Sequence, residues 1–407
     1  MNIVVTGASL TGNKGASAMC ISVINALKNK YGSDINIGLL SPKPDLDVDL
    51  ANDLNIRLFS YGGILRKSIP NHMFYTLFKK PIFHNDSVYD SYKWANLIID
   101  IHGINFSDSD SLVSTAIIPS AQIFLAHLLG VPIVKFTQTF GPMHRLTIKL
   151  FAKLFLPLVS NIFPREKTAY ESLKSIGLKN LEPVTVDSAF LLPPEDLQAL
   201  KKIKQSSIKR VAFIPNAILL SKSINYMEVC SKLISMIISE GYKPVIIMHY
   251  SKPSSDEALL DKSSNNDYQL IQELLKRISN DDKKNIEVYA EEYSSNELKG
   301  IIGSCELAVP SRYHALVASI SQAIPSFCVG WAGKYEGLLD RVGLKRYSFC
   351  ADKQGSFNID NILTSFKVFL ESYSSGNLDI RSEVVELRAE CGDSYNRLFQ
   401  IIESHDQ

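Results

Sequence analysis

Residues 301–325 have the sequence IIGSCELAVPSRYHALVASISQAIP, the most informative stretch of the chain. The short apolar run that ends at Val309 predicts a buried strand, and the apolar residues beyond the turn predict a helix. Arg312 and His314 therefore fall on the turn that joins this strand to this helix. Short apolar strands followed directly by helices are typical of α/β proteins with parallel sheets.

Arg312 and His314 give this turn groups that can bind an anion and move a proton. Free N–H groups and the positive dipole end at a helix start favour negative charge. Arginine adds a planar fork suited to carboxylate or phosphate, and histidine transfers protons near neutral pH. The turn is therefore interpreted as a catalytic site for a phosphorylated or carboxylated substrate. The alternative is that both residues only join the turn to the sheet.

A second strand-to-helix turn lies at the start of the chain, where the apolar residues 2–7 precede the glycine-bearing loop 8–15. This arrangement can hold a phosphate or a sugar nucleotide, although a turn without a ligand is the alternative. An ATPase is disfavoured because Lys14 precedes glycine and alanine, which breaks the Walker pattern. A nicotinamide enzyme is disfavoured because Asp45 and Asp47 follow a proline turn and do not end the second strand.

The alternation of strands and helices continues along the chain and predicts two parallel sheets. In the first half, strands are expected near residues 2–7, 35–40, 56–60, 96–101, 132–137, 161–163 and 183–187, with helices near 15–30, 113–129, 144–158 and 167–176. In the second half, strands are expected near 210–215, 243–248, 285–289, 307–309 and 326–329, with helices near 225–240, 266–279, 295–303, 314–323 and 334–341. The polar residues 193–207 are the linker candidate, and residues from 358 onward are predicted helical with a break near 374–379.

The composition indicates a large enzyme, since 407 residues with 45% apolar content suffice for two or three domains. A net charge of +1 without long basic runs argues against a nucleic-acid partner. The six cysteines form neither a C-x-x-C pair nor a set with histidine, which indicates reduced thiols and no zinc site. The opening residues lack a basic leader, and prolines interrupt the longest apolar region, 116–134, so neither a signal peptide nor a membrane span is expected.

Five motifs occur in a fixed order: GNKGA at 12–16, QTFGP at 138–142, RE at 165–166, VDSAF at 186–190 and RYHAL at 312–316. In this order they resemble the polysaccharide pyruvyl transferase family over roughly residues 2–345. The resemblance implies two facing Rossmann-like domains with parallel sheets, as in the B-type glycosyltransferase architecture. It also implies transfer of a pyruvyl group from phosphoenolpyruvate to a sugar, usually as a cyclic ketal.

This architecture and the linker candidate suggest a domain plan. Residues 1–192 would form an acceptor-side domain and residues 208–357 a donor-side domain, with the linker 193–207 joining them. By the resemblance, the helical segment 358–407 would pack back on the first domain. Ligands of open α/β sheets bind at the carboxyl ends of the strands, where both turns lie. A cleft between the two domains is the expected place for the reaction.

The expected chemistry assigns roles to individual residues. Phosphoenolpyruvate carries a phosphate and a carboxylate, and its transfer starts when a proton reaches the methylene carbon. We expect His314 as the acid or base and Arg312 as the second catalytic group, which binds the donor. The further donor-binding candidates are Lys334, Arg165, Asn13, Lys14 and Gly15. No metal and no cofactor besides the donor substrate are expected.

The acceptor-binding candidates are His102, Asn105 and Gln138. His102 and Asn105 lie in IHGIN, residues 101–105, where many relatives carry a run of glycines. Relatives also often have Arg-Asp where this chain has Arg-Glu at 165–166. Two alternatives stay open here: an ion pair of Arg165 with Glu166, and a loop-capping role for Asn105 and the nearby Asp108.

Three other functions stay open. A nucleotide-sugar glycosyltransferase of the same architecture would use Arg312 and Lys334 to neutralise a diphosphate. A non-catalytic glycan-binding protein would use the turns to bind acidic sugars. A peripheral membrane scaffold is the third. The acceptor would be a sugar of a polysaccharide or of its lipid-linked precursor, as in exopolysaccharide or other cell-surface glycan biosynthesis.

The membrane hypothesis depends on two basic and aromatic stretches. The first holds Arg66, Lys67, Lys79 and Lys80 around Phe74, Tyr75, Phe78 and Phe83, and the second holds Arg145, Lys149 and Lys153 on a predicted helix. Such a surface can bind an anionic bilayer, with a solvated helix face as the alternative. We expect a cytoplasmic enzyme, with peripheral contact at the inner face of the membrane as the hypothesis.

Overall fold

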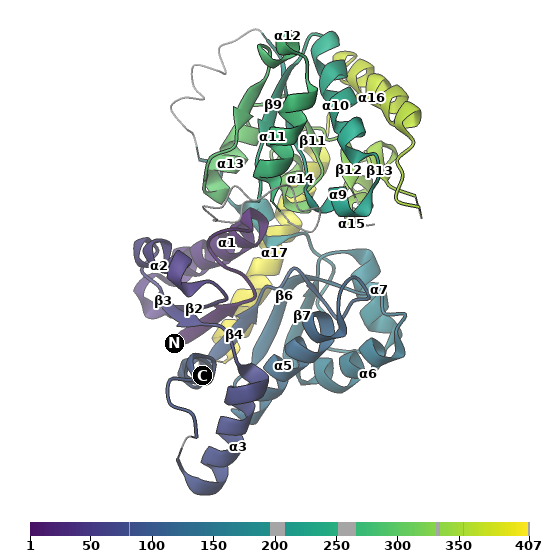
Figure 1. The fold of residues 1–407 in the computed structure, drawn as a ribbon. Helices are drawn as coiled ribbons and strands as arrows, with labels where there is room; N and C mark the ends of the chain where they lie inside the picture. The colour runs from purple at the N-terminus through teal and green to yellow at the C-terminus, as the bar shows by residue number, and fades with distance from the viewer. Residues whose placement is uncertain (81, 196–207, 251–265, 331–333, 353, 406–407) are drawn as a thin grey trace. The chain divides into compact units, whose positions relative to one another are not determined.

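The computed structural model describes residues 1–80, 82–195, 208–250, 266–330, 334–352 and 354–405. These residues form two compact units, each a parallel sheet flanked by helices (Figure 1). The first unit comprises Met1–Thr11, Ala16–Ser188 and Ala389–Gln407, and the second comprises Gly12–Gly15 and Ala189–Arg388. The glycine loop near the start of the chain therefore belongs to the second unit, although the segments on either side of it belong to the first.

The sheet of the first unit has the strand order β3-β2-β1-β4-β6-β5, and β7 also pairs with β6. Every pairing is parallel. Its central strand β4 is buried along its whole length, because helices cover both faces of the sheet and an apolar sequence is required there. The strands are β1 (Asn2–Thr6), β2 (Asn36–Ser41), β3 (Arg57–Ser60), β4 (Leu97–Asp100), β5 (Ile104–Asn105), β6 (Ile133–Phe140) and β7 (Asn161–Pro164).

The helices of the first unit show clear local start signals. Proline stands in the first turn of α2 and α5, where its missing N–H costs no hydrogen bond. The Asp86 side chain caps α4 by accepting from the N–H of Tyr89. The helices are α1 (Lys14–Tyr31), α2 (Pro44–Asp53), α3 (Ile69–Phe78), α4 (Ser87–Trp94), α5 (Ile118–Leu128), α6 (Leu146–Phe155) and α7 (Lys167–Ser175).

The second unit repeats this organisation, with a four-stranded parallel sheet in the order β10-β9-β8-β11 and a parallel pair β12-β13. Its strands are β8 (Arg210–Ile214), β9 (Lys243–Ile247), β10 (Glu287–Tyr289), β11 (Leu307–Pro310), β12 (Cys328–Gly330) and β13 (Ser348–Cys350). Its helices are α9 (Ile218–Lys222), α10 (Tyr226–Ser239), α11 (Asp267–Arg277), α12 (Asn280–Lys283), α13 (Ser295–Ile302), α14 (Tyr313–Ile320), α15 (Lys334–Asp340) and α16 (Ile359–Ser374). The predicted α/β fold with parallel sheets is confirmed.

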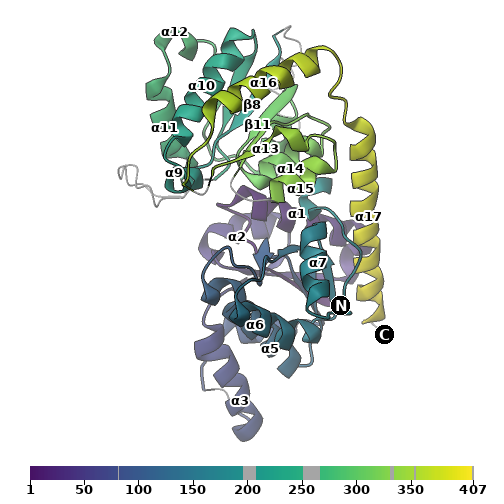
Figure 2. The ribbon, with the colours of Figure 1, turned by 90° about the vertical axis from the view of Figure 1, so that its right-hand side faces the viewer.

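The last helix, α17 (Arg381–Ser404), starts in the second unit and ends in the first (Figure 2). The hydroxyl of Tyr395 lies 3.0 Å from that of Ser22 on α1, and its ring makes an edge contact with Phe136, with centroids 5.1 Å apart. Tyr31 also donates to the carbonyl of Phe399 over 3.2 Å. The end of the chain is therefore part of the core of the first unit.

Several element predictions are wrong in detail. Residues 183–187 form no strand: the N–H of Thr185 donates to the carbonyl of Pro164, but Pro183 has no N–H to extend the pairing. The predicted proline turn at Asp45 and Asp47 is helix α2. The predicted helix 113–129 starts with a π-helical turn, Val113–Ile117, and 144–158 ends with a 3-10 turn, Leu156–Leu158. Helices α3 and α4 were not predicted. Most of the linker candidate, residues 196–207, lies outside the described residues.

Candidate active site

The strand-to-turn-to-helix prediction around Arg312 is confirmed: β11 ends at Pro310, α14 starts at Tyr313, and Arg312 is the N-cap residue. Buried partners hold the turn at Ser311. Its N–H donates to the carbonyl of Ile214 over 2.8 Å, and its own carbonyl accepts from Asn216 at 2.9 Å and Tyr335 at 3.1 Å. The backbone that presents Arg312 is therefore tied to the sheet on both sides.

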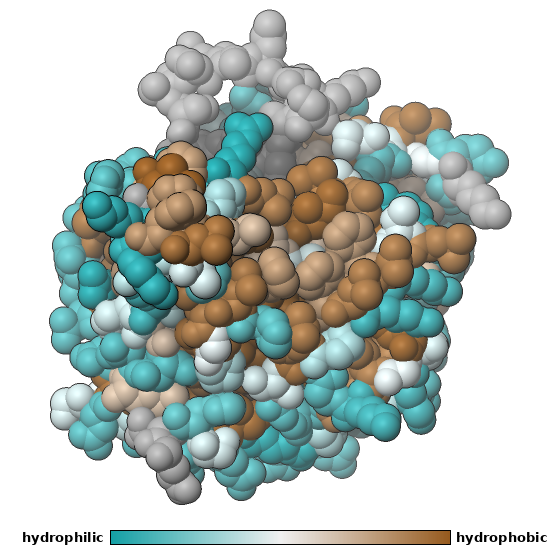
Figure 3. All heavy atoms as spheres, turned by 90° about the horizontal axis from the view of Figure 1, so that it is seen from below, coloured by the Kyte–Doolittle hydropathy of each residue, from teal (hydrophilic) through white to brown (hydrophobic). Residues whose placement is uncertain are grey.

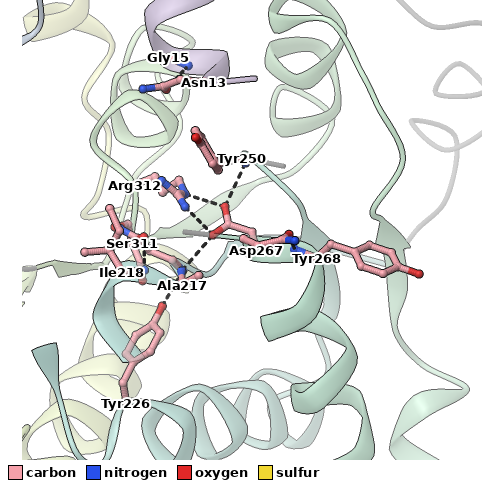
Figure 4. A network of polar contacts seen from close by, with 12 residues as sticks. Asn13, Gly15, Ala217, Ile218, Tyr226, Tyr250, Asp267, Tyr268, Ser311 and Arg312 are labelled. Carbon is pink, nitrogen blue, oxygen red and sulfur yellow. Dashed lines mark hydrogen bonds and ion pairs between the residues drawn. The ribbon is translucent and has the colours of Figure 1, made fainter. Parts of the chain in front are cut away.

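Asp267, the first residue of α11, fixes the orientation of the Arg312 side chain (Figure 4). The carboxylate of Asp267 is fully buried and accepts from Nε of Arg312 at 2.6 Å and from Nη2 at 2.5 Å. It also accepts from the N–H groups of Ala217 and Tyr250 at 2.9 and 3.0 Å. The Tyr250 ring lies 5.2 Å from the guanidinium carbon, at cation–π distance. The arginine is thus held in one plane, with its charge balanced by one carboxylate.

The predicted loop at Asn13 to Gly15 packs on the same part of the second unit. Asn13 forms an antiparallel β-bridge with Tyr250, and its side chain accepts from the N–H of Gly15 at 3.2 Å. Lys14 is largely buried and pairs with Glu292 at 2.8 Å. The carbonyl of Lys14 accepts from the hydroxyl of Ser295 at 2.8 Å. Figure 4 shows the Tyr250 ring between this loop and Arg312.

Gly15 lies directly against the half-buried imidazole of His314. A Cβ atom on Gly15 would fall 2.1 Å from Nδ1 of His314 and 2.7 Å from its Cβ, so no side chain fits at residue 15 without moving the histidine. The glycine loop and the Arg312 turn, separated by about three hundred residues in sequence, therefore meet at His314. This contact joins the predicted residues Asn13, Lys14, Gly15, Arg312 and His314 into one cluster of the second unit.

A fourth basic side chain, His249, lies at the base of this cluster. Its pKa is well below the usual histidine value, first because it is buried and then because Arg312, His314 and Lys14 repel a further positive charge. His249 is therefore neutral at physiological pH. Arg312, His314 and Lys14 therefore all lie close enough to His249 to act on it, and carboxylates of Asp267 and Glu292 pair with two of these three basic side chains.

We expect Gly15→Ala to lower kcat about 100-fold, because displacing a reacting group by about 1 Å can cost that much. The displaced group is the imidazole of His314, which a methyl group at residue 15 would meet. Steady-state kinetics with both substrates saturating would measure the loss. Gly392→Ala is the matched control, since a Cβ there meets nothing within 4 Å. Unchanged kcat in Gly15→Ala would show that the contact does not position His314.

In the first unit, His102 follows β4 and pairs with Asp100, the last residue of that strand. The Asp100 carboxylate is fully buried and lies 2.7 Å from Nδ1 of His102 and 2.5 Å from Nζ of the buried Lys135. Burial raises the pKa of Asp100, but Lys135 and His102 outweigh it, and the pKa lies well below the usual range. An ionised carboxylate only accepts, so Nδ1 of His102 donates to Asp100, and Nε2 is the ring nitrogen that does not face this carboxylate.

The other predicted ligand residues of the first unit are buried. Gln138 donates to the Asp100 carboxylate at 2.9 Å, and Asn105 lies 3.0 Å from the Gln138 side chain. Gln138 therefore holds the Asp100 carboxylate directly, and Asn105 contributes through Gln138. Arg165 is also buried and pairs with Glu166 at 3.1 Å and Asp187 at 2.5 Å, so we omit it from the donor site. The side chain of Lys334, at the start of α15, lies outside the described residues.

Two acidic residues have structural roles, and for Asp108 the structure supports the loop-capping alternative. Asp47, on α2, accepts from the N–H groups of Leu10 and Thr11 at 3.1 and 2.9 Å, so it fixes the loop that follows β1. Asp108 accepts from the N–H of His144 and pairs with Arg145 at 3.0 Å, which caps the start of α6. Within the described residues, no group of three His, Cys, Asp or Glu side chains could hold a metal ion.

The fold is shared with UDP-GlcNAc 2-epimerases and with a glycosyltransferase. The UDP-GlcNAc 2-epimerase from Neisseria meningitidis, solved with UDP-GlcNAc, superposes with a TM-score of 0.59 at 10% identity, covering 99% of this chain and 100% of that one. The glycosyltransferase VinC in complex with dTDP gives 0.54 at 10% identity, covering all of both chains. The UDP-GlcNAc 2-epimerase from Methanocaldococcus jannaschii gives 0.53 at 13%, covering 90% and 92%. These likenesses define a protein with two Rossmann-like domains of the B-type glycosyltransferase architecture.

The sequence model of the polysaccharide pyruvyl transferase family matches residues 13–333. The chain therefore belongs to this family of enzymes, which transfer a pyruvyl group to polysaccharide. No curated protein matches it. The match includes the glycine loop and the Arg312 turn, the two segments that meet at His314. In the part of the chain that the structure describes, no helix is both long and apolar enough to cross a bilayer.

Proposed function

We propose that this protein transfers the pyruvyl group of phosphoenolpyruvate to a sugar of a polysaccharide or of its lipid-linked precursor, forming a cyclic ketal and releasing phosphate. The observation that carries the proposal is the cluster of Lys14, Arg312 and His314 around the start of α14. Phosphoenolpyruvate bears two anionic groups on a three-carbon skeleton, and such a donor needs concentrated positive charge. Since the donor is a cytoplasmic metabolite, the proposal also puts the enzyme in the cytoplasm.

Arg312 and the loop at residues 13–15 would hold the donor. Because Asp267 balances the charge of Arg312, Arg312 would bind the donor mainly through the fixed direction of its N–H groups and less through net charge. N–H groups at the start of α14 would add to the attraction for phosphate or carboxylate. Lys14 has a mostly exposed partner, Glu292, whose side chain is 58% exposed, so this ion pair can exchange for a donor anion at small cost. Lys334 stays a donor-binding candidate on the family pattern alone.

His314 would supply the proton that starts the reaction. Protonation of the methylene carbon turns it into a methyl group and leaves an oxocarbenium-like centre at the carbon that bears phosphate. An acceptor hydroxyl adds to this centre and loses its proton. A second hydroxyl of the same sugar then replaces phosphate and closes the ketal, so one donor and one diol give one ketal and one phosphate. His314 suits the first step because imidazole transfers protons efficiently near neutral pH.

His102 would bind the acceptor. Its Nδ1–H is held by Asp100, so Nε2 can accept a hydrogen bond from a sugar hydroxyl, and about 30% of the side chain is exposed. Asn105 and Gln138 would act indirectly, by fixing Asp100.

We expect His102→Ala to raise the KM for the acceptor about two- to tenfold, the usual effect of losing one hydrogen bond, and to leave the KM for the donor unchanged. Initial rates with each substrate varied in turn would measure both constants. His127→Ala is the matched control, because His127 is exposed on α5. Equal changes in both KM values, or none, would contradict an acceptor-side role for His102.

A nucleotide-sugar glycosyltransferase is the second candidate, because the structural neighbours were solved with UDP-GlcNAc or dTDP. The basic side chains of Lys14, Arg312 and His314 would then face a diphosphate. Phosphate and nucleoside diphosphate release should be assayed with phosphoenolpyruvate and with a panel of sugar nucleotides, each with lipid-linked oligosaccharides as acceptors. We expect phosphate release that depends on the acceptor when phosphoenolpyruvate is the donor, and no nucleoside diphosphate release with any sugar nucleotide. Nucleoside diphosphate release, with no phosphate from phosphoenolpyruvate, would support the second candidate and contradict the first.

A further inference from the structure

Three leucines form an exposed apolar stripe on α6. Leu146, Leu150 and Leu154 recur every four residues and are 80%, 57% and 59% exposed, while Ile148 and Ala152 on the opposite face are buried. The helix therefore packs on the first unit through one apolar face and presents a second one outward. Isolated exposed leucines are common, but a row of three needs an explanation.

Helix α3 carries a second set of exposed apolar side chains. Met73, Leu77 and Phe78 are 59%, 75% and 59% exposed, and Phe78 contacts Phe74 with ring centroids 4.3 Å apart. The turn before α3, Ile64–Ser68, packs against α5, and so does α6. The turn before α3 and helix α6 are therefore both anchored on α5 of the first unit. Figure 3 shows the result as a broad apolar face with hydrophilic side chains at its margins.

The two sequence segments that form α3 and α6 carry only positive formal charges. No Asp or Glu occurs from residue 54 to 85, or from 111 to 165. The exposed cations beside the apolar stripes are Lys79 and Lys80 at the end of α3 and Lys149 and Lys153 on α6. Arg145 contributes less than the sequence suggested, because Asp108 neutralises it. Leucine and phenylalanine beside lysines, in segments without acidic residues, match the interface of an anionic bilayer. The apolar groups would lie among the acyl chains and the cations at the headgroups.

We propose that the α3–α6 surface, defined by Met73, Leu77, Phe78, Leu146, Leu150 and Leu154 with Lys79, Lys80, Lys149 and Lys153, docks the enzyme on an anionic lipid bilayer. The inference goes beyond the proposed function, because it depends on exposure and charge in the first unit and on no step of the chemistry. It would bring the enzyme to the surface where a lipid-linked glycan is available.

Sedimentation of the full chain with vesicles tests the proposal. Wild type should sediment with vesicles of phosphatidylcholine and phosphatidylglycerol, and much less with phosphatidylcholine alone. Lys149→Gln with Lys153→Gln should lower the partition coefficient about thirtyfold, since each near-surface cation contributes about fivefold. Leu150→Ser with Leu154→Ser should lower it about tenfold or more at unchanged charge. The matched control is Lys367→Gln with Val368→Ser, an exposed pair on α16 that should change nothing.

Three outcomes would overturn the proposal. The first is a wild-type protein that stays in the supernatant with anionic vesicles. The second is an α16 control that loses as much binding as the α6 variants. The third is a concentration-dependent dimer in analytical ultracentrifugation that Leu150→Ser with Leu154→Ser dissociates, with no vesicle binding. That result would make a second copy of the chain the occupant of the surface.

Discussion

His314→Ala should lower kcat by about 10²–10⁴-fold while the protein stays folded, because a positioned proton donor contributes that much to rate. The imidazole is half-buried at the start of α14, and its Nδ1 faces Gly15, so its removal leaves a small gap at the edge of the unit and not in its core. Phosphoenolpyruvate affinity should change little, since Arg312 and the loop at residues 13–15 remain. Calorimetric binding, the melting temperature and single-turnover rates separate these effects.

The control for His314→Ala is the same substitution at the exposed His127, which should leave turnover unchanged. Two results would contradict the role of His314 as acid. One is a folded His314→Ala enzyme with near-normal kcat. The other is a parallel fall of stability and activity, which would make the residue part of the scaffold of the turn.

Asp267→Asn should destabilise the second unit by about 3–5 kcal/mol, because it leaves the charge of Arg312 without its carboxylate in a largely buried site. The side chain of Arg312 is 12% exposed, which favours the lower end of this range. The guanidinium would also lose its fixed plane, so donor affinity should fall. Urea unfolding and phosphoenolpyruvate titration measure the two effects.

The double variant Asp267→Asn with Arg312→Met distinguishes the stability of the pair from its function. Removing both charges should restore much of the lost stability, as buried ion pairs are often replaceable by neutral groups, but it should not restore donor binding. The exposed pair Lys284–Asp281 gives the control, since Asp281→Asn there should cost less than about 1 kcal/mol. Full donor affinity in Asp267→Asn would show that this carboxylate does not position Arg312.

The sequence predicted those parts of the site that are formed by residues close together in the chain. The strand, turn and helix around Arg312 follow from apolar periodicity within about 25 residues, and the structure confirms them. Asp267 was missed because its pairing with Arg312 spans 45 residues and depends on how the start of α11 meets the turn after β11 in the folded unit. Nothing in the local pattern distinguishes it from an ordinary acidic residue at a helix start.

The same limit explains the two other large differences. The loop at residues 12–15 belongs to the second unit because Asn13 pairs with Tyr250 and Lys14 with Glu292, contacts across more than two hundred residues. Helix α3 was missed because its apolar residues lie all round the helix, so no single buried stripe marks it. The exposed Leu77 and Phe78 that obscure this pattern are the residues that carry the proposed bilayer contact.

The most direct test of the central claim is the mass and isotope content of the product made from phosphoenolpyruvate and a lipid-linked oligosaccharide in D2O. The account predicts a product heavier than the acceptor by pyruvic acid less one water, one phosphate released per product, and one deuterium in the new methyl group. That deuterium would report protonation of the methylene carbon from a group that exchanges with solvent, the role assigned to His314. A product heavier by a sugar residue, formed from a sugar nucleotide with no transfer from phosphoenolpyruvate, would contradict the account.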